Sequence, residues 1–249
     1  MTAPCARFPG ALQTVSPIGI YRRLLKVYGP QGWWPVTVGA DARPRYRPGF
    51  HGRLTERQAW EVCVGAIMTQ NTAWGNVEKA LRALHEAGVR SPQAVLDAPS
   101  AKLERLIRPS GYFRRKAVKL KALARHLRGR GGRVVAWLNG GAQADRRQEL
   151  LGIYGIGPET ADSMLLYACA RPAFVVDAYT RRIGERLGWY KAATYDCAQR
   201  FLVGSLASDP VLYNECHALL VALAKNHCRK TPACSGCPLQ EVCLHGLSG

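Results

Sequence analysis

The sequence lacks any apolar run long enough to span a membrane, and its first thirty residues lack the apolar core of a signal peptide. It also lacks internal repeats, a low-complexity tail and any convincing stretch of alternating polar and apolar residues. Helical periodicity is found along most of the chain instead. We therefore expect an all-α fold in a soluble, cytoplasmic protein that has no membrane partner.

Acidic residues are scarce. The chain has 17 Asp and Glu against 35 Lys and Arg, which leaves a net charge of +18 and an isoelectric point near 9.9. A polyanionic partner such as nucleic acid is the simplest explanation, although ribosome association or adaptation to the host solvent gives the same sign. The 249 residues, 47% of them hydrophobic, are enough for one large or two modest domains with buried cores.

The paired CxxC motifs that are usual in zinc ribbons are also lacking, because only one CxxC is present among nine cysteines. Five cysteines are scattered, mostly in apolar helical patterns, and we interpret them as reduced thiols packed as small hydrophobic side chains. These five are Cys5, Cys63, Cys169, Cys197 and Cys216.

The other four cysteines lie within sixteen residues near the C-terminus. Their pattern is Cys228-x5-Cys234-x2-Cys237-x5-Cys243. Thiolates so close together favour a single metal centre, and their softness selects zinc or iron–sulfur. The spacing alone does not separate these two possibilities.

Residues 151–182 carry the most informative pattern, in which a helical segment ends at a Gly155-Ile156-Gly157 turn and a second apolar helix opens at Pro158. The pattern predicts a helix–hairpin–helix whose exposed N–H groups suit a DNA phosphate, and a plain helix-joining turn is the alternative. After this helix, expected to end near residue 170, comes Asp177, an acid that follows an apolar pair. By itself, Asp177 is equally well explained as a helix N-cap.

This combination resembles the core of the endonuclease III superfamily of DNA glycosylases, where a hairpin of the form Gly-apolar-Gly precedes a helix and a catalytic aspartate in a Val-Asp motif. The resemblance extends from about residue 18 to 244. It implies two helical domains with a DNA-binding cleft between them and Asp177 at its mouth. One domain is a six-helix barrel, 54–173, that ends in the helix–hairpin–helix. The other combines 1–53 with 174–249 and carries an iron–sulfur cluster loop.

The resemblance also assigns DNA contacts. Gly155, Ile156 and Gly157 would bind the backbone, and Gln70 matches a glutamine that fills the space left by an extruded nucleotide. From the residues alone, the stretch around Gln70 is a turn in which Asn71 or Thr72 caps the next helix.

A second DNA-binding loop is implied near residue 112. Tyr112 occupies the position of an apolar wedge between bases, and Arg114 and Lys116 would contact neighbouring phosphates. Trp33 and Trp34, in a Trp-Trp-Pro motif, match the branch that resembles bacterial 3-methyladenine glycosylase, where the motif helps to sandwich the damaged base. Packing of a loop onto the body is the alternative for this tryptophan pair.

Endonuclease III relatives end in C-x6-C-x2-C-x5-C, which binds a 4Fe-4S cluster. The present chain is one residue shorter in the first gap, a difference that a loop absorbs. The resemblance therefore implies a 4Fe-4S cluster on Cys228, Cys234, Cys237 and Cys243, with zinc as the alternative. Its expected role is structural.

Family members that also cut the DNA strand carry a lysine two residues past the hairpin, because an amine is needed to form a Schiff base with the sugar. Glu159 occupies this position, so we expect a monofunctional glycosylase whose AP lyase activity is absent or weak. Asp177 would stabilise an oxocarbenium-like cation or activate water. Cation–π stacking on Trp33 and Trp34 favours alkylated purines such as 3-methyladenine.

Two alternatives remain open. One is an endonuclease III-type glycosylase and AP lyase that acts on oxidised pyrimidines through another amine. The other is a catalytically weak iron–sulfur protein that binds DNA damage. In each case the expected partner is double-stranded DNA containing a damaged base, and the expected protein is a monomer, associated with the nucleoid if the source is bacterial.

Overall fold

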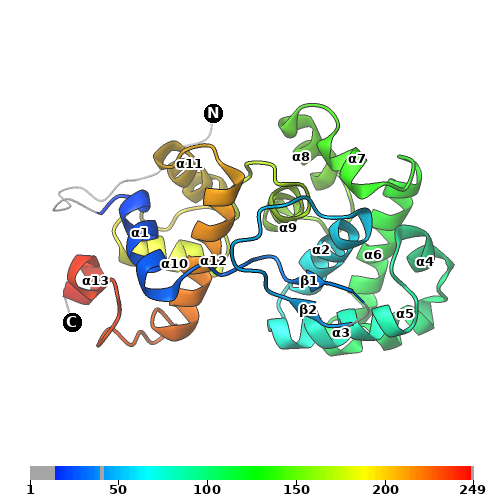
Figure 1. Cartoon of the computed structure of the whole chain (residues 1–249), viewed down its shortest axis with the longest axis horizontal. Coiled ribbons are helices and arrows are strands. Elements are labelled where there is room, and N and C mark those ends of the chain that lie inside the picture. Colours follow the sequence, from blue (N-terminus) through cyan, green and yellow to red (C-terminus); the bar gives the residue numbers. More distant parts are fainter. Residues whose placement is uncertain (1–14, 40–41, 248–249) are drawn as a thin grey trace. The chain divides into compact units, whose positions relative to one another are not determined.

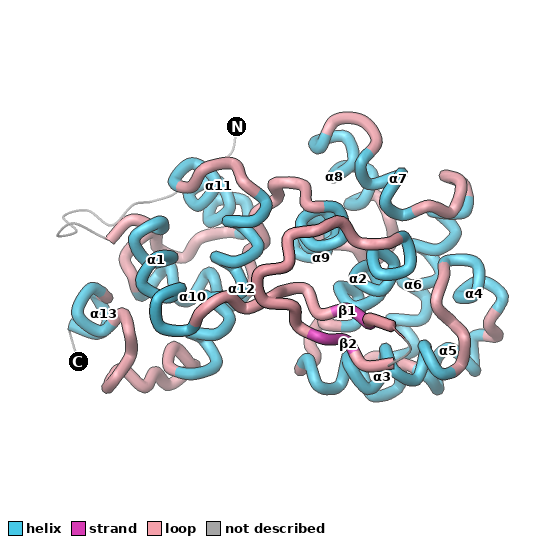
Figure 2. The backbone as a smooth tube through the Cα atoms, viewed as in Figure 1, coloured by secondary structure: helices cyan, strands magenta, loops and turns pink. Residues whose placement is uncertain are grey.

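The computed structural model describes residues 15–39 and 42–247, and nearly all of its regular structure is helical (Figures 1 and 2). The contacts divide the chain into two compact units. Unit 1 comprises residues 1–33 and 174–249, and unit 2 comprises residues 34–173. The expected all-α fold is confirmed. A short antiparallel ladder of β1 (Val36–Thr37) and β2 (Pro44–Arg45) departs from it.

Unit 2 runs from the β1–β2 ladder to the second helix of the predicted hairpin. Its helices are α2 (Glu56–Met68), α3 (Trp74–Glu86), α4 (Pro92–Asp97), α5 (Ser100–Leu106), the 3-10 turn η1 (Arg108–Ser110), α6 (Phe113–Arg128), α7 (Val134–Asn139), α8 (Gln143–Leu151), α9 (Pro158–Ser163) and the π-helical turn η2 (Met164–Ala168).

Helix α2 lies at the centre of unit 2. Nine of its thirteen residues are buried, because its apolar residues are not confined to one face. It contacts α3, α6, α7, α9 and η2. The helix begins in a capping box, in which the Thr55 and Gln58 side chains each accept a hydrogen bond from the backbone N–H of the other.

The domain boundary expected at residue 53 is shifted in the structure, because residues 34–53 group with unit 2. The Trp34 ring packs against Trp74 and Tyr167, with centroids 5.4 and 5.0 Å apart. The N–H and hydroxyl of Thr37 both donate to Oε1 of Glu61 on α2, at 2.8 and 3.0 Å. These contacts tie the segment to α2 and α3. The break after residue 173 coincides with the expected one.

Unit 1 is built around α12 (Pro210–Asn226), which contacts α1 (Pro17–Tyr28) and α10 (Ala178–Arg186). Ten of the seventeen residues of α12 are buried. The remaining elements are α11 (Tyr195–Ser205), the 3-10 turn η3 (Gln240–Val242) and α13 (Leu244–Leu247). Residues 18–28, in which apolar side chains recur at helical spacing, lie in α1. No helix among the described residues has the length and hydropathy needed to cross a membrane.

Most of the scattered cysteines are free thiols, as the sequence predicts. Cys63, Cys169 and Cys216 are free, and burial raises the pKa of the Cys169 and Cys216 thiols to about 12. Cys197 is disulfide-bonded, so its interpretation as a reduced thiol is wrong. Sequence spacing does not reveal which sulfurs a fold brings within bonding distance. Cys5 lies outside the described residues.

Candidate active site and DNA interface

The predicted helix–hairpin–helix is present in unit 2. Helix α8 ends at Leu151, the turn passes through Gly155 with φ of +82°, and α9 opens at Pro158. Any other residue at position 155 would hold its backbone in an unfavourable left-handed conformation. Its Cβ would also collide with the side chain of Lys119. Ile156 is buried against the helices, as a plug between them should be. Gly157, Pro158 and Glu159 are exposed, so the start of α9 faces solvent.

A buried ion pair clamps the two hairpin helices together. On α8, Arg147 donates from Nε and Nη2 to the two carboxylate oxygens of Asp162 on α9, at 2.7 and 3.0 Å. Asp162 is completely buried, and the bidentate geometry is the strongest that an arginine and a carboxylate can make. No local pattern in the sequence predicts this pair. The available signal is Asp162, an acid that stands just before the apolar stretch that begins at Met164.

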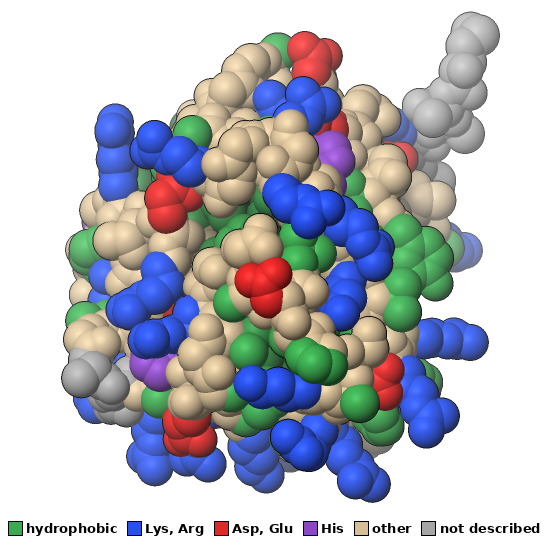
Figure 3. All heavy atoms as spheres, turned by 90° about the vertical axis from the view of Figure 1, so that its right-hand side faces the viewer, with side chains coloured by type: hydrophobic (Ala, Val, Ile, Leu, Met, Phe, Trp, Pro, Cys, Tyr) green, Lys and Arg blue, Asp and Glu red, His purple; other side chains and the backbone are tan. Residues whose placement is uncertain are grey.

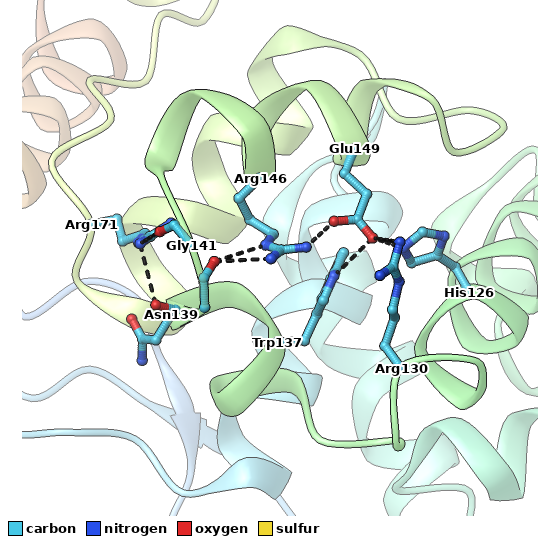
Figure 4. A network of polar contacts seen from close by, with 9 residues as sticks. His126, Arg130, Trp137, Asn139, Gly141, Arg146, Glu149 and Arg171 are labelled. Carbon is cyan, nitrogen blue, oxygen red and sulfur yellow. Dashed lines mark hydrogen bonds and ion pairs between the residues drawn. The ribbon is translucent and has the colours of Figure 1, made fainter.

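A polar cluster centred on Glu149 joins α8 to its neighbours (Figure 4). Glu149 accepts hydrogen bonds from His126 Nε2 at 2.7 Å and from Trp137 Nε1 at 3.2 Å, and it pairs with Arg130 at 2.9 Å and with Arg146. Burial and the charges of Arg130 and Arg146 lower the pKa of His126. Helix α8 is thereby held on α6 and α7.

Gln70 lies directly against the hairpin. Its Nε2 donates to the carbonyl oxygen of Gly155 at 3.1 Å and to Oγ1 of Thr160 at 3.0 Å, and its Oε1 accepts from Lys119 at 2.5 Å. The structure therefore brings together two regions that the sequence assigned separately to DNA binding. The expected insertion of Gln70 into a duplex stays a prediction, and it requires the amide to exchange these bonds for others.

Lys116 does not contact solvent, which corrects its assignment as a phosphate ligand. Its side chain is 2% exposed, and Nζ donates to the carbonyl oxygens of Met68 and Ser110 at 2.8 and 2.6 Å and to Oγ1 of Thr72 at 3.1 Å. Burial, with the nearby charge of Lys119, lowers the pKa of Lys116 to about 8. Its ammonium group anchors the loop that carries Gln70.

The alternative assignment of Asn71 or Thr72 as a helix cap is also wrong. The N-cap of α3 is Ala73, whose side chain makes no capping bond, and the Thr72 hydroxyl donates instead to the Ser110 carbonyl oxygen. Asn71 adopts a left-handed conformation with φ of +52°, which makes the turn.

Tyr112 and Arg114 are available to a partner. Tyr112 is 67% exposed and has a left-handed φ of +44°. Arg114 has a side chain that is 83% exposed, with a long ion pair of 3.9 Å to Glu104. An ion pair of this length and exposure contributes little to stability. The assigned contacts with bases and phosphates remain predictions for both residues.

In unit 1, Asp177 is the N-cap of α10. Its Oδ1 accepts from the N–H of Thr180 at 2.7 Å and from the Thr180 hydroxyl at 2.9 Å. Its Oδ2 lies 3.7 Å from Nε2 of His217 on α12. Burial acts to raise the pKa of Asp177, but the interactions with His217 and Thr180 outweigh it and lower that pKa. The N-cap role is thus confirmed, and a catalytic role is compatible with it.

Trp33 also contacts His217, with ring centroids 5.7 Å apart and an edge-to-face angle of 75°. Asn214 holds the Trp33 carbonyl oxygen through a hydrogen bond of 2.9 Å. The structure therefore brings the predicted stacking residue and the predicted catalytic acid into one cluster, through a histidine that the motifs do not reveal. The available signal is a histidine inside the apolar run of α12.

Trp34 has a different environment. It is 8% exposed, and its ring lies against Trp74, Tyr167 and Gly65 in unit 2. A Cβ at Gly65 would lie 3.2 Å from the Trp34 ring, so the glycine permits this close approach. Little of the Trp34 ring is left for a base. The packing alternative is therefore the better description of Trp34, and the stacking prediction rests on Trp33.

All four C-terminal cysteines line one cavity in unit 1. The cavity encloses about 380 Å³ of non-protein space, open solvent included, and Ile183 and Leu223 form part of its wall. Arg186 donates to the Cys228 sulfur at 3.1 Å. Among the described residues, no three His, Cys, Asp or Glu side chains converge on a site for a single metal ion. Four free thiols around one cavity are the donor set that a thiolate-bound metal centre requires. These thiols are Cys228, Cys234, Cys237 and Cys243.

Comparison with known proteins shows the family. Residues 64–206 match the model of the HhH-GPD superfamily base excision DNA repair proteins. Over 231 residues the chain is 40% identical to a putative DNA repair glycosylase of Methanocaldococcus jannaschii, an alignment that covers 90% of this chain and 94% of the relative. The chain belongs to the HhH-GPD superfamily of base excision DNA repair proteins.

Solved structures confirm the fold. An endonuclease III trapped as a covalent intermediate with DNA superposes with a TM-score of 0.72 at 22% identity, over 94% of this chain and 98% of the other. The 3-methyladenine DNA glycosylase of H. pylori bound to 1,N6-ethenoadenine superposes with a TM-score of 0.67 at 24% identity, over 85% and 98%. The expected endonuclease III-type architecture is therefore confirmed.

Proposed function

We propose that this protein is a monofunctional DNA glycosylase that removes alkylated purines from double-stranded DNA. The observation that carries the proposal is the environment of Asp177, a largely buried carboxylate with a lowered pKa that shares a histidine neighbour with Trp33. An ionised carboxylate of this kind stabilises positive charge on a reacting sugar. Membership of a base excision repair superfamily supports the reaction class.

The chemistry requires a flipped nucleotide whose C1′–N bond breaks with the electron pair leaving on the base. Water then forms the C1′–O bond and loses a proton. Because the pKa of Asp177 is lowered, its carboxylate is a weak proton acceptor but a stable anion. Of the two roles expected for Asp177, electrostatic stabilisation of the oxocarbenium-like sugar is therefore favoured over the activation of water.

The side chain of Glu159 supports the monofunctional assignment. It is exposed in the first turn of α9, where a carboxylate interacts favourably with the helix dipole. A carboxylate does not form an imine with the sugar, so this position does not supply the Schiff base that strand cleavage needs.

Selection of alkylated purines is supported by Trp33. Alkylation at a ring nitrogen gives the purine a positive charge, which improves it as a leaving group and attracts it to an aromatic face. The structural neighbour from H. pylori is named as a 3-methyladenine glycosylase and has a similar fold. An oxidised pyrimidine lacks this charge and gains less from stacking on an indole ring.

DNA binding is supported by charge and by exposed residues. The net charge is +18, and Lys and Arg side chains far outnumber acidic ones on the face shown in Figure 3. In unit 2 the hairpin turn, Tyr112 and Arg114 all reach the surface. Backbone N–H groups and cationic side chains are the usual phosphate ligands.

We also propose that Cys228, Cys234, Cys237 and Cys243 hold a 4Fe-4S cluster, with zinc as the alternative. The shared cavity and the four free thiols support the proposal. A cluster would cross-link the C-terminal loop to itself next to α10 and α12, whose residues Ile183 and Leu223 line the same cavity.

The test is base release from three duplexes that carry 3-methyladenine, thymine glycol or a T·G mismatch, with and without alkali. We expect the alkylated duplex to be cut only after alkali, and Asp177→Asn to abolish release. Glu159→Lys supplies the missing amine and is expected to yield a product that borohydride traps.

Other outcomes contradict the proposal in distinct ways. Cleavage by the unaltered protein without alkali, together with borohydride trapping, would indicate an endonuclease III-type lyase. Release that survives Asp177→Asn would remove the assigned catalytic residue. Tight binding to damaged duplexes without release from any of them would favour the damage-binding alternative.

A further inference from the structure

Helix α12 carries an unexpected polar residue in its buried region. His217 is 4% exposed and is followed by the apolar run Ala218–Ala224. A histidine in such a place costs free energy relative to a leucine unless its ring interacts with polar partners. Packing of α12 alone therefore gives no reason for an imidazole here, whereas the contact with Asp177 does.

The two carboxylate oxygens of Asp177 have different neighbours. Oδ1 is occupied by both donors of Thr180, which fix it at the start of α10. Oδ2 faces Nε2 of His217 at 3.7 Å, and the same imidazole lies edge to face with Trp33. One ring thus contacts both the carboxylate and the aromatic residue expected to stack on the base.

We propose that His217 is a positioning residue for Asp177, which keeps Oδ2 oriented and ionised beside Trp33 during removal of the base. This inference rests on the proposed function. It adds a residue that acts through Asp177 and assigns it no proton transfer of its own. Trp33 and Asp177 then respond together to any change of the imidazole.

The proposal predicts how Asp177 titrates. The groups that face it are His217 from α12 and Thr180 from its own helix, and Tyr190, which donates to the Thr180 carbonyl oxygen at 3.1 Å, is an ionisable neighbour that senses the Asp177 charge. Without the imidazole, burial of the carboxyl is opposed by Thr180 alone. The pKa of Asp177 should then rise, so activity should be lost at a higher pH as the solution is acidified.

The variants are His217→Phe, which keeps a ring beside Trp33 but removes the polar atoms, and His217→Gln, which keeps a polar donor. His51→Gln, in an exposed loop of unit 2, is the matched histidine control. Single-turnover release of 3-methyladenine is measured between about pH 4 and about pH 9, with DNA affinity and melting temperature measured in parallel.

We expect His217→Phe to slow base release by about 10- to 100-fold, with DNA affinity within about twofold of the unaltered protein. The acid limb of its pH profile should move to higher pH. His217→Gln should recover part of the rate, and His51→Gln should leave rate and profile unchanged. A rate in His217→Phe equal to that of the unaltered protein, or a loss matched by weaker binding, would overturn the proposal.

A second measurement keeps the inference separate from the proposed function. The carboxyl carbon of Asp177 is followed by NMR in protein labelled with 13C-aspartate and is assigned by comparison with Asp177→Asn. A higher pKa in folded His217→Phe supports the pairing even if no substrate is processed. Identical titration of Asp177 in both proteins overturns it, whatever the enzyme assays show.

Discussion

At the scale of single residues, Lys116 and Arg114 show that basic side chains two positions apart on α6 have opposite roles. The sequence assigned both to phosphate contacts. One is buried under three hydrogen bonds and the other projects into solvent. Helical geometry turns residues two apart to different faces, but the charge pattern alone does not say which face is covered.

We predict that Lys116→Met lowers the free energy of unfolding by about 2–4 kcal/mol, because the buried Met68 carbonyl oxygen loses its lysine donor and the Ser110 carbonyl oxygen keeps only the Thr72 hydroxyl. The matched variant Arg114→Met should change stability by less than about 0.5 kcal/mol but weaken DNA binding and reduce its salt dependence by about one charge. Urea unfolding and DNA titration at several salt concentrations measure the two effects.

The assignment of Lys116 to structure and of Arg114 to DNA binding requires that one variant loses stability and the other loses affinity for DNA. If Lys116→Met unfolds like the unaltered protein and instead loses salt-dependent affinity for DNA, the lysine is a phosphate ligand after all and the buried bonds have little energetic weight.

Single-residue roles were predictable from the sequence where they depend on local chemistry. Asp177 as an N-cap and Gly155 as a left-handed turn residue follow from a few neighbours in the chain. His217 was not predictable, because its contacts with Asp177 and Trp33 join residues far apart in the sequence. Its environment is set by the tertiary packing of α12.

At the scale of elements, the hairpin is held in shape mainly by side chains outside the turn itself. The Arg147–Asp162 pair joins α8 to α9, and Glu149 joins α8 to α6 and α7. The start of α9 at Pro158 and the glycine turn were predicted correctly. The helix expected over 158–170 is confirmed as an unbroken helical run over 158–169, in which α9 passes into a π-helical turn at Met164. Propensities do not distinguish π from α geometry.

We predict that Asp162→Asn destabilises the protein by about 3–5 kcal/mol, because it leaves the Arg147 guanidinium without its charged partner in a largely buried site. The double variant Arg147→Met with Asp162→Leu should recover much of that loss, since it buries no charge. Denaturant unfolding of both single variants and the double variant gives the coupling. Asp145→Asn, at an exposed position on α8, is the control.

Additive losses in the double variant would show that the two residues act independently. In that case the hairpin would have to be held by the Glu149 cluster alone, and Glu149→Gln should then produce the larger effect.

At the scale of the whole molecule, chain order and spatial grouping differ. Residues 15–33 pack with the C-terminal helices, whereas the next residues pack with α2 and α3. The family resemblance implied such a split but placed it after residue 53. The aromatic contacts of Trp34 with Trp74 and Tyr167 place the segment that follows Trp33 in unit 2, and amino-acid composition does not predict such contacts.

The stability of unit 1 should depend on the group that the four C-terminal cysteines bind. Their cavity is walled by apolar residues of α10 and α12, so a loop released from its metal centre would expose that wall. We predict that anaerobically purified protein is brown and contains about four iron and about four sulfide per chain. Removal of the iron, or Cys234→Ser, should lower the melting temperature. Cys63→Ala, at a buried free thiol in unit 2, should retain full iron content.

Iron content, metal analysis and melting of the two variants decide between the metals. A colourless protein that contains one zinc per chain would show that the four sulfurs hold zinc and not a 4Fe-4S cluster. Equal iron content in Cys234→Ser and Cys63→Ala would remove Cys234 from the ligand set. Since the loop also carries Arg229 and Lys230, whose carbonyl oxygens accept from Arg186, its loss should weaken DNA binding along with stability.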